Sequence, residues 1–529
     1  MQLRMWMYDL AREQSPSLEF LHQLCQRSLA HGYNAIGLYL EHRFAYPSAP
    51  WMHGTGCVKP AMVRELEDTY PDLQIVPFLN LLGHFEGMLF TEEGRLFAEE
   101  RFGGMQACPS QPAFVAFARQ LIDDTLAAFR SPLVHIGGDE TLQLGKCTEC
   151  EQRESKAAIY GEHFGPLAEY VIAQGRRPAV WGDMFFDHPE ALASLPKETL
   201  IFDWEYFIGP WQTSKPFFDA GFEVVFSPTI FTYSATWMHL PQAERNVREH
   251  IQAAHDLGAY GVCVTTWECG LFGNYASMLP AIDACGDLMS QEPPVAMATP
   301  PVATENLNAA RWKLENYAHV TEASAFLRSY LLVSERHEEW ARLMGVELQT
   351  AGGLFAYTGH RSVLKTRLLL WANPFLAWFH HAEELCGPVG DHALDILERA
   401  IGMAPDADMR GVSEFGKLAI QFVRHAEASH QAYARREPGE AVRALAPARQ
   451  VFESLEAIAI GNNLRCGGSL ADIARCQVAK EHVEKVVRRI HAHGDGSLGY
   501  LPSFEHITHP KSMPHDQGAW WRMNHWGNE

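Results

Sequence analysis

The sequence predicts a (β/α)8 barrel followed by an α-helical C-terminal domain. Over residues 1–290, eight short apolar runs typical of buried strands alternate with segments of helical periodicity. After this region, apolar residues recur at helical spacing. The alternative for the first region is an open doubly wound sheet. We disfavour it because no glycine-rich dinucleotide or phosphate loop follows the first predicted strand.

The predicted strands are rich in β-branched or aromatic residues and lead into polar residues or glycine. In order, they are Leu3–Tyr8, Asn34–Leu40, Gln74–Asn80, Leu133–Ile136, Pro178–Trp181, Leu200–Trp204, Glu223–Ser227 and Gly261–Trp267. Helical periodicity between them covers Ser17–Ala30, Pro112–Phe129, Gly165–Gln174 and Gln242–Leu257. Residues 291–306, rich in Pro and Ala, are predicted to be a linker. Residues 307–529 would form the helical domain, which ends in a tail rich in aromatic residues and histidine.

Composition and charge disfavour several classes of function. The 529 residues carry a net charge of −21 at pH 7, so we expect no nucleic-acid partner. No run of about 18 apolar residues occurs, and we therefore expect no membrane span. Arg4 and Asp9 interrupt any apolar signal segment, and the odd count of eleven cysteines does not suggest a disulfide framework. These features together predict a cytoplasmic protein.

Charged and aromatic residues follow the ends of the predicted strands. In a barrel, the active site lies at the carboxyl ends of the strands. The residues that gather there are Glu41, His84, Asp139, Glu140, Trp181, Asp183, Trp204, Glu205, Tyr206, Tyr233, Trp267 and Glu268. Aromatic faces stack on the C–H surfaces of sugars, and carboxylates hold hydroxyl groups. This combination therefore predicts a carbohydrate site.

The sharpest signal is the segment LVHIGGDET at 133–141, in which Asp139 and Glu140 end a buried strand. Neighbouring side chains on a strand point in opposite directions, so the two carboxylates are predicted to do different work. One would protonate a leaving group while the other orients the substrate. The alternative is a pair that only caps a following helix. The polar and aromatic rim around the pair argues against that alternative.

On these residues the sequence resembles glycoside hydrolase family 20, the β-N-acetylhexosaminidases. His135-x-Gly-Gly-Asp139-Glu140 resembles the family's catalytic signature, and Gly83-His84 resembles the end of its Pro-Gly-His segment. The spacing of Arg4 from Asp9 matches that of the family's sugar-binding arginine. The chain looks like the short bacterial subgroup that lacks the N-terminal domain.

Four positions depart from the family pattern, among them Leu82, which replaces a proline, and Met5, which replaces a glycine. Glu41 replaces the aspartate that follows the second strand, and the resemblance implies that Glu41 pairs with His84. Ala235 stands where the family has an aspartate two positions after the tyrosine that corresponds to Tyr233. These departures concern the preferred sugar more than the reaction.

The resemblance implies an exo-acting, retaining β-N-acetylhexosaminidase that removes terminal GlcNAc or GalNAc by substrate-assisted catalysis. Glu140 would be the general acid, and Asp139 would bind the acetamido N–H while the acetamido oxygen attacks C1. The partner would be a small oligosaccharide or glycoside, and catalysis would require no cofactor. The implied substrate-binding residues are Arg4, Glu41, His84, Trp181, Asp183, Trp204, Tyr206, Tyr233, Trp267 and Glu268.

Two other functions stay open. A retaining β-glycosidase would use Glu268 or Glu205 as an enzyme nucleophile, but this scheme leaves Asp139 without a role. A non-catalytic sugar-binding barrel would not need both Asp139 and Glu140. The helical domain carries no catalytic pattern, and we expect it to cover the barrel or to support a homodimer.

A pair of cysteines follows the catalytic strand. Cys147-Thr-Glu-Cys150 has the spacing of half a zinc site. Cys57 and Cys108 lie in loops predicted to leave the same face of the barrel, and they would complete a structural zinc site. The alternative is a pair of free or redox-active thiols.

Overall fold

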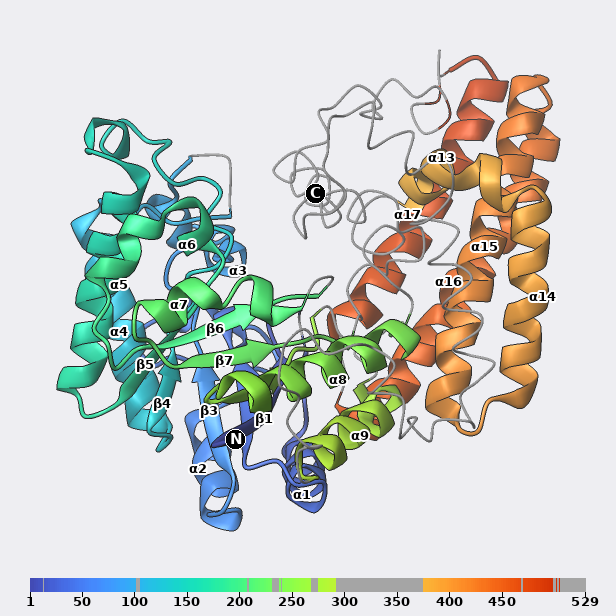
Figure 1. Ribbon diagram of the computed structural model, residues 1–529. Helices are drawn as coiled ribbons and strands as arrows, with labels where there is room; N and C mark the ends of the chain where they lie inside the picture. Colours follow the sequence, from blue (N-terminus) through green and yellow to red (C-terminus); the bar gives the residue numbers. More distant parts are fainter. Residues whose placement is uncertain are drawn as a thin grey trace. The chain divides into compact units, whose positions relative to one another are not determined.

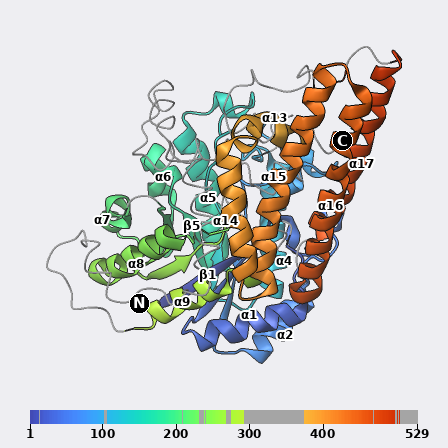
Figure 2. The ribbon, with the colours of Figure 1, turned by 90° about the vertical axis from the view of Figure 1, so that its right-hand side faces the viewer.

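The computed structural model describes residues 1–12, 14–100, 105–206, 209–230, 237–238, 240–267, 275–291, 374–467, 470–497, 501 and 504. The chain divides into two compact units, which are considered separately. The first is a strand barrel with surrounding helices, and the second consists of long helices (Figures 1 and 2). Apart from Gln291, the predicted linker lies outside the described residues, as does the tail from residue 505.

Eight parallel strands form a closed barrel in sequence order. They are β1 (Leu3–Asp9), β2 (Ala35–Tyr39), β3 (Gln74–Phe78), β4 (Leu133–His135), β5 (Arg177–Trp181), β6 (Leu200–Trp204), β7 (Val224–Ser227) and β8 (Gly261–Val264). β8 pairs with β1 and closes the sheet. The predicted (β/α)8 barrel is confirmed. Several strands end before their predicted limits, since the chain there turns into the loops that carry polar residues.

Helices follow the strands and surround the barrel (Figure 1). They are α1 (Leu18–Ala30), α2 (Pro60–Thr69), α3 (Glu86–Leu89), α4 (Pro112–Ala128), α5 (Lys156–Ala173), α6 (Met184–Asp187), α7 (Lys215–Asp219), α8 (Leu240–Leu257) and α9 (Leu279–Met289). α5 begins earlier than the apolar periodicity predicts. Its start is fixed by Ser155, whose side chain accepts a hydrogen bond from the Ala158 N–H.

Side chains from alternate strand positions fill the barrel interior. Met5 and Met7 of β1 point inward, and large aromatic rings occupy the centre. The Phe78 ring stacks on His135, with centroids 4.5 Å apart and planes at 12°. Phe202 meets Phe78 edge-on at 5.7 Å. This packed layer supports the carboxyl ends of the strands.

The second unit is helical, which confirms the prediction of a helical C-terminal region. It contains α13 (Pro374–Leu385), α14 (Pro388–Met403), α15 (Ala407–Ala434), α16 (Pro438–Cys466) and α17 (Leu470–Gly494). Its core includes Phe422, whose ring lies 5.5 Å from that of Phe375 and 5.1 Å from that of Phe452. Within the described part of the chain, no helix combines the length and apolar character needed to span a membrane.

Substitution of Phe78 tests whether this aromatic layer supports the barrel. Replacement by Ala removes a completely buried ring, and the resulting cavity is expected to destabilise the barrel by about 3–5 kcal/mol. Scanning calorimetry of the full chain should show one transition moved to lower temperature. Leu96→Ala is the control, because Leu96 is 73% exposed and its loss should leave the transitions unchanged. An unmoved transition in Phe78→Ala would contradict this account of the core.

Candidate active site

The end of β4 places two adjacent carboxylates beside each other. After His135, the chain turns through Gly137, which has φ +83°. A Cβ at Gly137 would lie 2.8 Å from the Leu79 carbonyl oxygen, so glycine permits both the turn and the close approach. The buried Asp139 and the partly exposed Glu140 follow. Glu140 itself has φ +45°, an uncommon conformation for a residue with a side chain.

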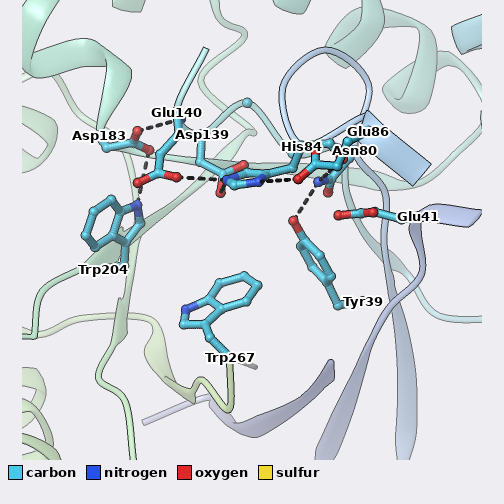
Figure 3. Close-up of polar contacts among 12 residues, drawn as sticks. Tyr39, Glu41, Asn80, His84, Glu86, Asp139, Glu140, Asp183, Trp204 and Trp267 are labelled. Atoms are coloured by element: carbon cyan, nitrogen blue, oxygen red, sulfur yellow. Dashed lines mark hydrogen bonds and ion pairs between the residues drawn. The ribbon is translucent and has the colours of Figure 1, made fainter. Parts of the chain in front are cut away.

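Asp183, in the turn after β5, holds this backbone. Its Oδ2 accepts a hydrogen bond from the Glu140 N–H at 2.9 Å, and its Oδ1 accepts one from Trp204 Nε1 at 3.2 Å. One side chain therefore links the loop after β4 to an indole ring at the end of β6. Figure 3 shows both bonds, with the Asp183 carboxylate above Trp204.

His84 lies at the centre of the charged groups. Its Nε2 is 3.0 Å from Glu140 Oε2 and 3.4 Å from Asp139 Oδ2, and its Nδ1 is 3.8 Å from Glu86 Oε1. Burial alone would lower the pKa of His84, but these three carboxylates raise it well above its ordinary value. His84 is therefore an imidazolium, and it joins Asp139 to Glu140.

A second cation lies at the end of β1. Arg12 Nη1 is 3.6 Å from Asp9 Oδ1 and 3.7 Å from Glu41 Oε1. The guanidinium carbon of Arg12 lies 5.5 Å from the centroid of the Tyr39 ring and 5.6 Å from that of Trp267. Arg12 thus connects buried carboxylates to an aromatic surface.

Aromatic rings face the charged groups from the other side (Figure 3). Trp267 meets Tyr39 edge-on with centroids 4.9 Å apart, and its Nε1 donates a hydrogen bond to the Tyr206 hydroxyl. Trp204 lies 5.1 Å from the Tyr206 ring. Trp181 is completely buried and supports Trp267 from the barrel interior at 5.7 Å. The partly exposed Trp204 and Trp267 are therefore the indoles placed to contact a ligand.

Burial shifts several carboxyl pKa values upward. It raises the pKa of Asp139 to about 6, although His84 opposes the shift. Burial and the charge of Asp139 raise the pKa of Asp183 to about 8. Burial alone raises that of Asp203 to about 7, and burial with the charge of Asp203 raises that of Glu205 to about 9. At neutral pH, Asp139 is thus mainly ionised, whereas Asp183 and Glu205 are mainly protonated.

The prediction that Arg4 binds the substrate is wrong. Alternation along β1 turns Met5 and Met7 into the barrel and Arg4 away from it. Arg4 also lies near the amino end of the strand, where its Nε donates to the Gly32 carbonyl at 2.7 Å. The expected pairing of Glu41 with His84 is also wrong, since Glu41 pairs with Arg12.

The structure brings together Glu41, His84, Asp139, Glu140, Asp183, Trp204, Tyr206 and Trp267. Two predicted contacts, Tyr233 and Glu268, lie outside the described residues. Sequence reasoning missed Tyr39, whose apolar strand suggests a core residue, although its hydroxyl accepts from Asn80 Nδ2 at 2.5 Å. Glu86 was also left out of the predicted site residues. Its position two residues after His84, at the same strand end, was the available signal.

Of the predicted metal ligands, Cys108, Cys147 and Cys150 lie together. Cys57 does not join them, which corrects that part of the prediction. Its loop follows β2, and its Sγ donates to the His42 carbonyl at 3.5 Å.

The raised pKa of Asp203 predicts the pH dependence of stability. An unfolded aspartate loses its proton near pH 3.9, whereas the folded Asp203 keeps it to about pH 7. Between these values the native state binds more protons than the unfolded state, so stability falls as pH rises, by at most about 1.4 kcal/mol per pH unit. Melting temperatures from pH 5 to pH 8 should therefore fall less steeply in Asp203→Asn than in the wild type.

Asp219→Asn is the matched control, because Asp219 is exposed on α7 and pairs with Lys215. Its profile should follow the wild type. Identical slopes in Asp203→Asn and the wild type would contradict the raised pKa of Asp203.

Part of the barrel is similar to a known protein family. Residues 91–275, which include Asp139, Glu140 and Asp183, match the sequence model described as glycosyl hydrolase family 20, catalytic domain. No curated protein sequence matches the chain.

Three solved structures that are similar to this chain come from bacterial enzymes. The β-N-acetylhexosaminidase from Bacteroides fragilis has 18% identity over 55% of this chain and 67% of that one, with a TM-score of 0.45. The exo-β-N-acetylglucosaminidase from Vibrio harveyi, in complex with N-acetylglucosamine, has 16% identity over 55% and 54%, with a TM-score of 0.43. The β-N-acetylhexosaminidase from Streptomyces coelicolor has 16% identity over 61% and 68%, with a TM-score of 0.43. The match thus covers about half the length of the Vibrio harveyi protein. The sequence-model match thus relates residues 91–275 of this chain to the catalytic domain of glycosyl hydrolase family 20.

Proposed function

We propose that this chain is an exo-acting, retaining β-N-acetylhexosaminidase that releases terminal GlcNAc or GalNAc from a small oligosaccharide or glycoside. One observation carries the proposal: Asp139 and Glu140 both reach the same nitrogen of His84, at 3.4 and 3.0 Å. The two carboxylates therefore converge at one point of the barrel rim. The match of residues 91–275 to the catalytic-domain model of glycosyl hydrolase family 20 supports the same substrate class.

In the proposed mechanism, Glu140 donates a proton to the glycosidic oxygen as the bond from this oxygen to C1 breaks. The substrate's 2-acetamido oxygen attacks C1 and forms an oxazolinium ion. Water then attacks C1, with Glu140 as the base that accepts its proton. The two displacements retain the anomeric configuration. Because the nucleophile belongs to the substrate, its effective concentration at C1 is high.

Asp139 would accept a hydrogen bond from the acetamido N–H and stabilise the positive charge that develops on the acetamido group. This role requires an ionised carboxyl group. The pKa of Asp139, about 6, leaves it mainly ionised at neutral pH, because the neighbouring His84 imidazolium opposes the effect of burial. His84 acts as a positioning residue, since it holds Asp139 and Glu140 beside each other.

An enzyme nucleophile is less well supported. Glu205 is buried, and its pKa of about 9 leaves it protonated at neutral pH. A protonated carboxyl group is a poor nucleophile. Glu268 lies outside the described residues. The protonated state of Glu205 and the absence of a role for Asp139 both disfavour an enzyme nucleophile.

A matched pair of substrates tests the mechanism. The chain should hydrolyse 4-nitrophenyl N-acetyl-β-D-glucosaminide but not 4-nitrophenyl β-D-glucoside, which lacks the internal nucleophile. Asp139→Asn should lower kcat about a hundredfold or more, because the developing charge loses its anionic partner. Glu140→Gln should lower kcat by about 10²–10⁴, with a smaller loss on aglycones that leave without protonation.

Glu154→Gln is the control, because Glu154 is exposed on the loop before α5. Its activity should equal that of the wild type. Comparable cleavage of both substrates by the wild type would refute the substrate-assisted mechanism. Binding of N-acetylglucosamine without hydrolysis of either substrate would favour a sugar-binding barrel instead.

Asp183 offers a test of how Glu140 is positioned. In Asp183→Asn, the single amide oxygen can accept from the Glu140 N–H, but the amide nitrogen then faces the N–H of Trp204. We expect kcat to fall about tenfold to a hundredfold with little change in KM, because the catalytic loop loses a fixed position. Asp187→Asn, on the exposed face of α6, should behave as the wild type. An unchanged kcat in Asp183→Asn would show that this link does not position Glu140.

A further inference from the structure

Four metal-ligating side chains meet at a second place in the barrel unit. They are Glu99, Cys108, Cys147 and Cys150, and their ligand atoms all lie within 4.8 Å of one another. Glu99 and Cys108 come from the segment between β3 and α4, and the two other cysteines from the segment between β4 and α5. All three cysteines are free, and only Cys147 is not fully buried.

Three of the distances between ligand atoms are close to those of a tetrahedral zinc site. Cys108 Sγ lies 3.5 Å from Cys147 Sγ and 3.7 Å from Cys150 Sγ. Cys150 Sγ lies 3.4 Å from Glu99 Oε2. Zinc bonds of about 2.3 Å to sulfur and about 2.1 Å to oxygen, at tetrahedral angles, place sulfurs about 3.8 Å apart and sulfur and oxygen about 3.6 Å apart. A disulfide would require sulfurs about 2.05 Å apart.

Groups around the four side chains orient them as metal ligands. Glu99 Oε1 accepts from the backbone N–H groups of Lys146 at 2.8 Å and Cys147 at 3.0 Å, which leaves Oε2 directed at the thiols. The Cys150 N–H donates to Cys147 Sγ at 3.4 Å, and Ser110 Oγ lies 3.1 Å from Cys150 Sγ. Hydrogen bonds of this kind fix the direction of ligands and stabilise them in the deprotonated form.

We propose that Glu99, Cys108, Cys147 and Cys150 bind one zinc ion in a closed, structural site. Three thiolates favour zinc over calcium or magnesium, which prefer oxygen ligands. Four protein ligands complete a tetrahedron and leave no open position for a reacting water, so the site is structural. Binding releases the three thiol protons to solvent as the zinc–sulfur bonds form.

The proposed zinc would fasten together the two loops that form the catalytic centre. His84 begins the segment that contains Glu99 and Cys108, while Glu140 precedes Cys147 in the next one. Gln106 and Gln143 already link these segments, since the backbone N–H of each donates to the side-chain oxygen of the other at 3.0 Å. The contact between His84 and Glu140 joins the same two segments.

Metal analysis of the purified full chain tests the proposal. Elemental analysis should find one zinc per chain, and exchange for cobalt(II) should give the intense thiolate-to-cobalt absorption and visible bands of a tetrahedral site. Cys147→Ser should hold less than about a tenth of an equivalent and melt at a lower temperature. Cys57→Ser should keep the full equivalent, because Cys57 lies outside the cluster.

Glu99→Gln keeps the proposal testable if the cysteine variant does not fold. The single amide oxygen of glutamine can accept from the two backbone N–H groups or face the metal, but not both, and an amide NH2 group does not ligate zinc. A competing chelator should therefore remove zinc from Glu99→Gln at a concentration at least about tenfold lower than from the wild type. Wild-type protein that holds no zinc after incubation with the ion and a reductant would overturn the proposal. A full equivalent of zinc in Cys147→Ser would do the same. So would a disulfide among the three cysteines that persists in wild-type protein after treatment with the reductant.

Discussion

The imidazolium of His84 holds the candidate active site together, because it pairs with three acidic side chains that converge on it. Glu86, Asp139 and Glu140 all lie within 3.8 Å of its ring nitrogens. Carboxyl groups buried at this spacing are destabilised when ionised unless a cation lies beside them. His84 can carry that charge near neutral pH only because the carboxylates raise its pKa. The protonation of His84 and the ionisation of Asp139 are therefore mutually dependent.

The same centre is built on unusual backbone conformations. Among the described barrel residues, positive φ outside glycine occurs at Glu41, His84 and Glu140, at 37°, 47° and 45°. These residues follow the ends of three consecutive strands, and all three carry charged groups of the site. Such conformations cost about 1–3 kcal/mol each and persist only where surrounding contacts enforce them. The bond from the Glu140 N–H to Asp183 and the pair of Glu41 with Arg12 are contacts of this kind.

Sequence periodicity was sufficient to predict the eight strands, because both the buried strands and their helical connections leave a strong apolar pattern. Asp139 and Glu140 could also be predicted, since adjacent carboxylates at the end of an apolar strand are distinctive. Arg4 could not be placed from spacing alone, because only the strand register decides that it faces away from the interior. Glu99 carries no local motif, and it meets the cysteines only after two segments have folded together.

The balance of charge around the site bears on the proposed reaction. Asp183 and Glu205 are mainly protonated at neutral pH, so they add little negative charge. Asp139 remains ionised and lies beside the position where Glu140 would act. A positive oxazolinium ion would therefore form next to one buried anion in a site of low dielectric constant, where the attraction is stronger than in water. If Asp183 were ionised as well, its repulsion would raise the pKa of Asp139 further. The protonated state of Asp183 thus helps to keep Asp139 in the charged form that the mechanism requires.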